Sequence, residues 1–258
     1  MGVVNVTPDS FSDGGLYVEP ERAIAHGREL TDAGAAILDV GGESTRPGAE
    51  PVAVEEELAR VVPVVEGLAT AGSPPISVDT SKRVVAGAAL SAGAEIVNDV
   101  TSFRGDPEMA ALCAEREATV ILMHMAGSPR TMQDAPAYGD VVDEVRAFLA
   151  ERVEAALAAG IDESRIWLDP GIGFGKTAAH NHELLRRLGE LRELGRPLVI
   201  GTSRKSFLGA ADGSGTNDRL GGTIASSVLA AAEGADVLRV HDVAEVGQAL
   251  AVATAILG

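Results

Sequence analysis

Side chains that could bind a ligand follow almost every short apolar run of this 258-residue sequence. Carboxylates, carboxamides and a lysine could together hydrogen-bond the donor and acceptor edge of a flat heterocycle. The arginine and the histidine of VLRVH lie two residues apart, so both project from one side of an extended segment and could clamp a phosphate. These polar residues are Asn5, Glu43, Thr45, Arg46, Asp79, Asn98, His124, Asp169, Lys205, Arg239 and His241.

Each of these residues, taken alone, also has a purely structural interpretation. Asp79 could cap the helix that follows it, and Asn98 could end its strand in a turn. Asp169 precedes a proline and could start a turn, and His124 could be a hydrogen-bonded core histidine. What favours chemistry is that the polar residues occur together, one after each apolar run.

The apolar runs themselves have the composition of buried β-strands, and alanine- and leucine-rich helical stretches lie between them. Helices are expected, for example, over residues 19–33, 54–70 and 140–159. Strands that are apolar along their whole length indicate a parallel sheet covered by helices. Eight strands are predicted, over residues 3–6, 36–40, 75–80, 95–100, 118–124, 165–171, 197–203 and 237–241.

Eight such units fit one (β/α)8 TIM barrel, a single domain over residues 1–258, better than a doubly wound open sheet with the same alternation. In this barrel the active site lies at the carboxyl ends of the strands, where the polar residues fall. Because the first strand begins almost at Met1, the opposite end of the barrel is expected to be poorly closed. The glycine-rich segment 211–218 is expected to be a mobile loop.

Composition excludes several classes of protein. The formal net charge of −17 argues against a nucleic-acid partner, because phosphate backbones need a basic surface. The sequence has no apolar run of about 18 residues and no leader pattern, so we expect a cytoplasmic protein without membrane contact. The single cysteine, Cys113, lies in a helical stretch and is expected to be a buried structural thiol.

Two segments resemble binding motifs without matching them. DPGIGFGKT has Pro170 where the phosphate-binding loop G-x-x-x-x-G-K-[ST] requires its first glycine, so a nucleoside triphosphatase is disfavoured. HNHE, over residues 180–183, offers metal-ligand types but lacks a third partner. It is more typical of the start of a helix.

Three long segments, NVTPDSFSDGG, DVGGESTRPGA and IGTSRKSFLG, resemble the dihydropteroate synthase family. The shorter segments SVDT, VNDV, MHMAGSPRTMQ, LDPGIGFGKT and RVHDV match the same family in its usual order. The resemblance spans essentially the whole chain. It implies a transferase that displaces diphosphate from 6-hydroxymethyl-7,8-dihydropterin diphosphate with the amine of p-aminobenzoate. The product is 7,8-dihydropteroate, in folate biosynthesis.

The resemblance also implies a mechanism and partners. Ionisation of the pterin–diphosphate bond gives a cationic methylene that the amine captures, so no side-chain nucleophile is required. Mg²⁺ is the implied cofactor, the chain is expected to form a homodimer, and sulfonamides are expected to compete with p-aminobenzoate.

The resemblance assigns overlapping sets of residues, carried over one by one onto this sequence. The pterin set is Asp79, Asn98, Met123, Asp169, Phe174, Gly201 and Lys205. The diphosphate set is Asn5, Thr45, Arg46, Arg239 and His241, with Mg²⁺ near Asn5; these five and Lys205 form the catalytic set. The p-aminobenzoate set is Phe11, Thr45, Pro47, Lys205 and Ser206. Residues 7–15 and 44–49 are expected to close over the second substrate, with Asp13 ordering the first of these loops.

Three other functions remain as alternatives. A pterin-dependent methyltransferase domain would share the barrel but should lack the STRPG and SFSDGG segments. A non-catalytic paralogue would bind pterin without releasing diphosphate. A Schiff-base aldolase would need a neutral lysine at a strand end, for which Lys205 is the candidate.

Overall fold

The computed structural model describes residues 1–7, 20–46, 48–127, 130–215 and 218–257. Its strands are β1 (Gly2–Asn5), β2 (Leu38–Gly41), β3 (Ile76–Asp79), β4 (Ile96–Asp99), β5 (Thr119–Met123), β6 (Ile166–Asp169), β7 (Val199–Ile200) and β8 (Val237–Leu238). Its α-helices are α1 (Pro20–Asp32), α2 (Val54–Leu68), α3 (Arg83–Ser91), α4 (Met109–Glu115), α5 (Val141–Ala158), α6 (Ala178–Arg186), α7 (Leu188–Leu191), α8 (Ser206–Asp212), α9 (Leu220–Ala232) and α10 (Val243–Leu257). Short 3₁₀ turns are η2 (Glu163–Arg165) and η3 (Arg192–Leu194).

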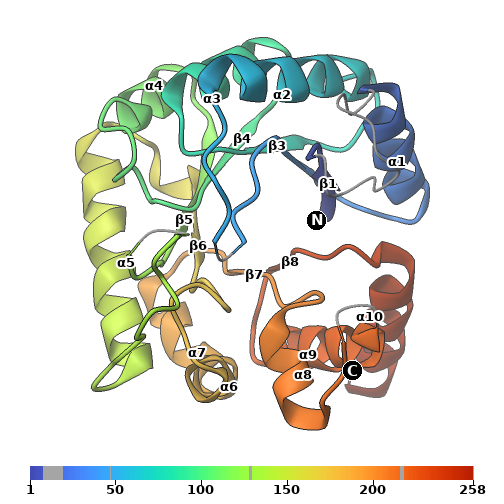
Figure 1. The fold of residues 1–258 in the computed structure, drawn as a ribbon, viewed down its shortest axis with the longest axis vertical. Helices are drawn as coiled ribbons and strands as arrows, with labels where there is room; N and C mark the ends of the chain where they lie inside the picture. Colours follow the sequence, from blue (N-terminus) through green and yellow to red (C-terminus); the bar gives the residue numbers. More distant parts are fainter. Residues whose placement is uncertain (8–19, 47, 128–129, 216–217, 258) are drawn as a thin grey trace.

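The strands form a closed ring with helices around it (Figure 1). Strands β1 to β6 pair in parallel in chain order, and β7 pairs in parallel with β8. Two bridges join these sheets, Leu168 with Leu198 and Gly2 with Val240. The predicted (β/α)8 barrel is therefore confirmed.

The end of the barrel beside Met1 is filled, so the expected poor closure there is wrong: Met1 is buried and shares one apolar cluster with Ile37, Ile96, Ile121 and Val199. The ammonium group of Met1 donates a hydrogen bond to the carbonyl of Leu238 at 2.9 Å. The amide of Val3 donates to the carbonyl of Val240 at 3.1 Å, and the amide of Val240 donates to the carbonyl of Met1 at 2.9 Å. These bonds tie β1 to the segment after β8, because backbone groups at the seam find partners in each other.

Capping side chains and glycines set where the helices begin and end. Helix α5, predicted over residues 140–159, begins after Asp140, whose carboxylate accepts hydrogen bonds from the amides of Val142 and Asp143. It ends before Gly160, which has a φ of +94°. Its buried side chains, such as Leu149, face the strands.

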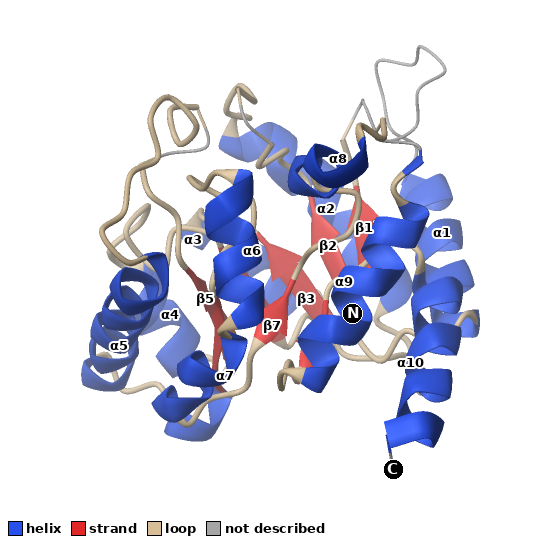
Figure 2. Cartoon of the chain, turned by 90° about the horizontal axis from the view of Figure 1, so that it is seen from below, coloured by secondary structure: helices blue, strands red, loops and turns tan. Residues whose placement is uncertain are grey.

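Helix α8 takes the first two residues of the segment 211–218, which was expected to be a loop, and the described residues 213–215 after it belong to no helix or strand. The helix continues to Asp212 and ends at Gly213, whose φ of +79° is a left-handed conformation that favours glycine. It lies at the end of the barrel where the strands finish (Figure 2). The HNHE segment, by contrast, lies in the first turns of α6 as expected.

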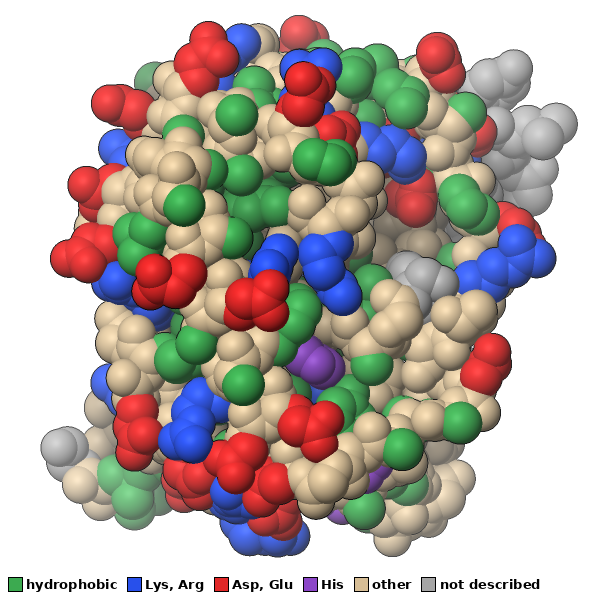
Figure 3. Space-filling view, turned by 90° about the vertical axis from the view of Figure 1, so that its left-hand side faces the viewer, with side chains coloured by type: hydrophobic (Ala, Val, Ile, Leu, Met, Phe, Trp, Pro, Cys, Tyr) green, Lys and Arg blue, Asp and Glu red, His purple; other side chains and the backbone are tan. Residues whose placement is uncertain are grey.

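The surface over α4 and α5 carries acidic and basic side chains side by side (Figure 3). No helix of the described residues is long and apolar enough to cross a membrane. Cys113 is buried in α4, where burial raises the pKa of its thiol to about 12, as expected for a structural thiol.

Candidate active site

Four predicted site residues lie side by side where neighbouring strands end. Asp79 at the end of β3 is in register with Asn98 of β4, and Met123 of β5 is in register with Asp169 of β6. All four side chains are buried. The barrel therefore brings two carboxylates and one amide to its mouth, as the sequence predicted.

Arg239 reaches the carboxylates from the segment after β8. Its Nε donates to Asp39 Oδ2 at 2.6 Å, and its NH2 group donates to Asp79 Oδ2 at 2.8 Å. The amide of Asn98 is 3.4 Å from the same Asp39 oxygen. Burial alone would lower the pKa of Arg239, but Asp39 and Asp79 more than offset it and raise that pKa above its usual value.

Asp39 is the site residue that the sequence analysis missed. It lies within β2, fully buried, and its Oδ1 has no hydrogen-bond partner among the described residues. The available signal was a charged residue inside the apolar run AILDV, because an ionised carboxylate is rarely buried there unless it is paired.

Lys205 lies just before α8 and points into the same mouth. Its ammonium group donates to the carbonyl of Ile172 and lies 4.7 Å from the centre of the Phe174 ring. Burial lowers the pKa of Lys205 to about 8, while Asp169 opposes this shift. Burial likewise raises the pKa of Asp169, opposed by Lys205. A Cβ at Gly201 would lie 3.5 Å from the Lys205 nitrogen, so this wall has little room for a larger side chain.

Phe174 lies on a tight turn, residues 171–175, which we name the glycine loop. Lys205 contacts this loop from the segment before α8. Gly171, Gly173 and Gly175 have φ values of +67°, +84° and +62°. A Cβ at Gly171 would lie 1.9 Å from the carbonyl oxygen of His124, so only glycine fits there. The loop therefore packs its backbone directly on the segment after β5.

Side chains hold the glycine loop by its carbonyl groups. Lys176 donates to the carbonyls of Gly171 and Phe174, each at 3.0 Å. Gln133 donates to the carbonyl of Gly173 at 2.9 Å, and the hydroxyl of Tyr138 to that of Gly175 at 2.8 Å. With the bond from Lys205 to Ile172, each of the five carbonyls has a side-chain donor.

His124 fits its structural interpretation. Its Nδ1 lies 2.8 Å from Lys176 Nζ, and its ring packs edge-on against Phe148 at 4.9 Å. Burial, with the nearby Lys176 charge, lowers the pKa of His124 to about 3. The neutral imidazole therefore accepts a hydrogen bond from Lys176 and belongs to the support of the glycine loop.

Glu43, also a candidate, is occupied by protein partners. Its Oε2 accepts from Lys82 Nζ and from the amide of Val52, the latter at 3.0 Å. Lys82 also binds Glu57, which is buried in α2. This cluster anchors the base of the segment between β2 and α2.

Other candidates lie nearer the rim. His241 Nδ1 is 3.0 Å from the hydroxyl of Ser203, and burial, with the Arg239 charge, lowers the pKa of His241 to about 4. Arg46 is exposed, although its charge acts on His241. No hydrogen bond within the described residues joins the side chains of Asn5, Thr45 or Ser206 to the buried group. Phe11, Asp13 and Pro47 lie outside the described residues.

Residues that could hold a metal by themselves do not gather in the described chain. Groups of three or more histidine, cysteine, aspartate or glutamate side chains with suitable geometry are absent there. His180 of HNHE instead completes a capping box with Thr177 at the start of α6.

The sequence and the fold match known proteins over nearly their full length. The model of the family described as pterin binding enzyme matches residues 1–241. Dihydropteroate synthase of Escherichia coli (strain K12) is 48% identical over 257 residues, which cover 100% of this chain and 91% of that protein.

Two solved structures share the fold closely. Dihydropteroate synthase of Xanthomonas albilineans with 4-aminobenzoic acid has a TM-score of 0.94 and 50% identity, covering 100% of this chain and 92% of that one. The same organism's enzyme in complex with 7,8-dihydropteroate has a TM-score of 0.90 and 47% identity, covering 100% and 93%. This chain therefore belongs to the pterin-binding enzymes and, among them, to the dihydropteroate synthase family.

Proposed function

We propose that this chain is a single-domain transferase that joins 6-hydroxymethyl-7,8-dihydropterin diphosphate to p-aminobenzoate, giving 7,8-dihydropteroate and diphosphate. The observation that carries the proposal is the buried group at the barrel mouth, in which Asp79, Asn98, Asp169 and Lys205 face one another. The relatives crystallised with 4-aminobenzoic acid and with 7,8-dihydropteroate support the choice of substrates.

The pterin edge would be read by the buried carboxylates, the amide and the lysine. Asp79 and Asp169 offer acceptors to the ring N–H groups, and Asn98 and Lys205 offer donors. Met123 and Phe174, which share one apolar cluster, would cover the faces of the ring, and Gly201 leaves room beside it. Such a pocket favours an electron-rich ring and therefore the cation that forms from it.

The reaction would begin when the bond between the pterin methylene carbon and the diphosphate oxygen breaks. The electron pair leaves with the diphosphate, and the carboxylates stabilise the cationic pterin. The amine of p-aminobenzoate then forms the new carbon–nitrogen bond and loses a proton. Positioning and electrostatic stabilisation supply the catalysis, so no side-chain nucleophile takes part.

The leaving diphosphate would meet Asn5, Thr45, Arg46, Arg239 and His241. Within the described chain, Nε and one NH2 hydrogen of Arg239 are directed to carboxylates, which leaves further donors of its five for phosphate oxygens. These groups give an acidic chain the local positive charge that an anion requires.

We assign Mg²⁺ a place beside Asn5. The side-chain oxygen of Asn5, at the end of β1, is a hard ligand of the type that Mg²⁺ prefers, and Mg²⁺ commonly binds through one or two protein oxygens together with substrate phosphates. Bound there, the ion would neutralise charge on the leaving diphosphate.

The second substrate would lie between the rim and Lys205. We assign it to Phe11, Thr45, Pro47, Lys205 and Ser206; Lys205 and Ser206 are adjacent at the start of α8. Closure of residues 7–15 and 44–49 would exclude water, which otherwise competes for the cation. Sulfonamides would inhibit by occupying the p-aminobenzoate position.

The test is diphosphate release from the pterin diphosphate with Mg²⁺, measured with and without p-aminobenzoate. Wild type should release diphosphate only when the amine is present. Asp169→Asn should lower kcat/KM about 10- to 100-fold, because it removes a charged hydrogen-bond acceptor from the pterin edge. Asp236→Asn, at the opposite end of the barrel beside Leu198, is the matched control. Pterin binding without diphosphate release in wild type would instead identify a non-catalytic paralogue.

The same proposal includes a cytoplasmic homodimer. Helices α9 and α10 pack together and expose large apolar side chains: Leu229 is 64% exposed, Val252 55% and Ile256 77%. A second copy of the chain would remove this surface from water. Light scattering should give twice the chain mass for wild type and the single chain mass for Leu229→Glu. A wild-type monomer would contradict the dimer and leave the transferase untouched.

A further inference from the structure

Lys176 is a buried lysine for which neither the resemblance nor the proposed reaction provides a role. Its side chain is 3% exposed, and no carboxylate lies within ion-pair distance of it among the described residues. Burying an ammonium group without a counter-ion is costly, so it persists only where hydrogen bonds replace its hydration. Burial lowers the pKa of Lys176 to about 7, which expresses that cost, although the charge of Asp169 opposes the shift.

The ammonium group finds one acceptor for each of its three hydrogens. Nζ lies 2.8 Å from His124 Nδ1 and 3.0 Å from each of the carbonyl oxygens of Gly171 and Phe174. A fourth contact, to the carbonyl of His124 at 3.4 Å, is long. The charged form of Lys176 thus ties the glycine loop to the segment after β5.

The two loop carbonyls that accept hydrogen bonds from Lys176 belong to the residue before Ile172 and to Phe174 itself, and Lys205 contacts the loop at Ile172 and Phe174. Between Gly171 and Phe174 lies Ile172, whose carbonyl accepts the hydrogen bond from Lys205. Phe174 itself carries the ring that lies 4.7 Å from the Lys205 nitrogen. Both contacts of Lys205 with the loop therefore depend on backbone that Lys176 fixes.

We propose that Lys176 is a positioning residue for the pterin site: it holds the glycine loop so that the Ile172 carbonyl and the Phe174 ring place the Lys205 ammonium group against the pterin. The inference rests on the proposed function, in which Lys205 contacts the pterin. Lys176 itself touches no substrate.

A buried lysine suits this task better than an apolar residue of similar length. The backbone between residues 171 and 175 folds with three glycines in left-handed conformation, and its carbonyls cannot pair with a neighbouring strand. Without Lys176 the Phe174 carbonyl loses its side-chain donor, and the Gly171 carbonyl keeps only the bond from the Phe174 amide at 3.0 Å. Lys176→Met keeps the length of the side chain and removes all three hydrogen bonds, so it isolates the contribution of the ammonium group.

The matched control is Tyr138→Phe. The Tyr138 hydroxyl also donates to a carbonyl of the glycine loop, that of Gly175, but neither atom touches Lys205. The Phe ring keeps the packing of Tyr138 against His124 and His180. Both variants therefore lose at least one hydrogen bond to the glycine loop, but only Lys176→Met removes bonds that hold the residues in contact with Lys205.

The experiment measures the dissociation constant of 6-hydroxymethylpterin by calorimetry, and the KM of each substrate, for wild type and variants. Lys176→Met should raise the pterin dissociation constant and the KM of the pterin diphosphate about 10-fold, because a misplaced charged donor loses its bond. The KM of p-aminobenzoate should rise as well in Lys176→Met, because Lys205 also belongs to the p-aminobenzoate set, while all values of Tyr138→Phe should stay within about twofold of wild type. In a Lys205→Met background, adding Lys176→Met should lower pterin affinity clearly less than it does in wild type, because the part of the effect that acts through Lys205 is gone and only the displacement of Phe174 remains.

Each other outcome has a definite meaning. Equal pterin affinity for Lys176→Met and wild type, or the same loss in the Lys205→Met background, overturns the positioning role. A wild type that neither binds pterin nor releases diphosphate overturns the proposed function instead. If Lys176→Met does not fold, Lys176→Gln, which keeps two donors, should give a smaller loss of the same kind, and an unchanged affinity would again overturn the role.

Discussion

At the scale of single residues, the barrel mouth holds opposite charges that compensate one another. Asp39 and Asp79 share Arg239, and Asp169 faces Lys205. An isolated ion would be unstable at this depth, whereas paired ions tolerate burial. Pairing offsets burial only in part, because burial raises the pKa of Asp79 to about 7 while Arg239 opposes this shift, so Asp79 is ionised in about half of the molecules near pH 7.

Lys205 should give pterin affinity a dependence on pH. Its pKa of about 8 lies below the ordinary value of 10.5, so the ammonium form dominates below pH 8 and the neutral form above it. Because the ammonium form donates to the pterin, the dissociation constant should rise as pH increases from 7 to 9.5. Calorimetry across this range checks the expectation, with Lys205→Met expected to flatten the high-pH limb. A flat wild-type profile would count against a pterin contact for Lys205.

The sequence predicted most of these residues but not their pairing. A polar residue after an apolar run can be recognised by position, which is how Asp79, Asn98, Asp169 and Lys205 were found. Asp39 lies within its run, and its partner is 200 residues away along the chain. Only the closed ring brings Asp39 and Arg239 together, so no local pattern could have joined them.

At the scale of elements, the glycine loop should tolerate no side chain at Gly171. Gly171→Ala would place a Cβ 1.9 Å from the His124 carbonyl oxygen at a φ of +67°, so the loop must move and take its support of Lys205 with it. Pterin affinity should fall about 10-fold or more. Gly195→Ala is the matched control, since its φ is +66° and no atom lies within 4 Å of its added Cβ. A loss of pterin affinity in both variants would point to backbone strain alone.

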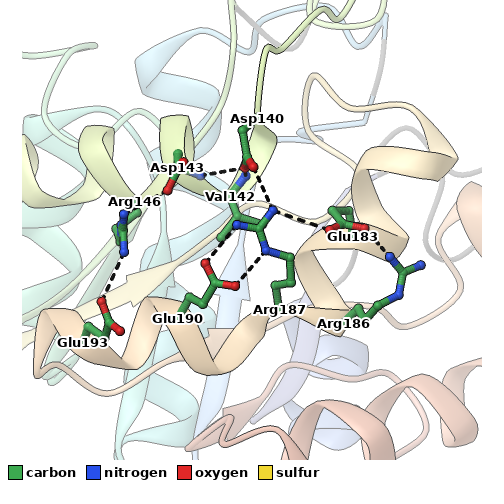
Figure 4. Close-up of polar contacts among 9 residues, drawn as sticks. All are labelled: Asp140, Val142, Asp143, Arg146, Glu183, Arg186, Arg187, Glu190 and Glu193. Carbon is green, nitrogen blue, oxygen red and sulfur yellow. Dashed lines mark hydrogen bonds and ion pairs between the residues drawn. The ribbon is translucent and has the colours of Figure 1, made fainter.

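The start of helix α5 offers a second test at this scale. Asp140 caps the helix and also binds Arg187 (Figure 4). Asp140→Ala should lower the Tm by a few degrees, because two helix amides lose their acceptor. Asp140→Asn keeps a capping oxygen and gives up only the half-buried ion pair with Arg187, so it should lie closer to wild type. Differential scanning calorimetry compares them. Equal losses in both variants would assign the stability to the ion pair.

The elements were predicted more reliably than their lengths. Helix α5 differs from its expected range by one residue at each end, because its cap and its terminal glycine are visible in the sequence. The last two strands were predicted over residues 197–203 and 237–241, but β7 and β8 pair over only two residues each. The predicted ranges included the residues after each apolar pair, 201–203 and 239–241, which lie beyond the paired strands, so the sequence overestimates the strand lengths.

At the scale of the whole molecule, Arg239 should also stabilise the barrel. Arg239→Gln leaves Asp39 and Asp79 buried without their partner, so the free energy of unfolding should fall by about 3 kcal/mol. Arg146→Gln, which removes two surface ion pairs of α5, with Asp143 and with Glu193, should cost less than about 1 kcal/mol. Urea unfolding followed by circular dichroism gives both values. Equal small losses would mean that the buried carboxylates become protonated at little cost.

The alternation of strands and helices in the sequence predicted the barrel architecture, but it did not predict the contacts that close the barrel. Eight alternating units predicted a barrel, because each strand must be covered by the helix that follows it. The seams between β6 and β7 and between β8 and β1 depend on contacts between distant parts of the chain. No periodic pattern describes them.

The division of the ring into a sheet of six strands and a sheet of two has a consequence for assembly. Asp79, Asn98 and Asp169 belong to the larger sheet, while Lys205 and Arg239 follow the strands of the smaller one. A chain cut beside Gly195, ahead of β7, would therefore separate the carboxylates of the pocket from Lys205 and Arg239, and the substrate pocket would form only when the two fragments associate. Recovered turnover would then report association of the two fragments. The barrel would serve as a split reporter in which the bound ligand, contacting both fragments, stabilises their association.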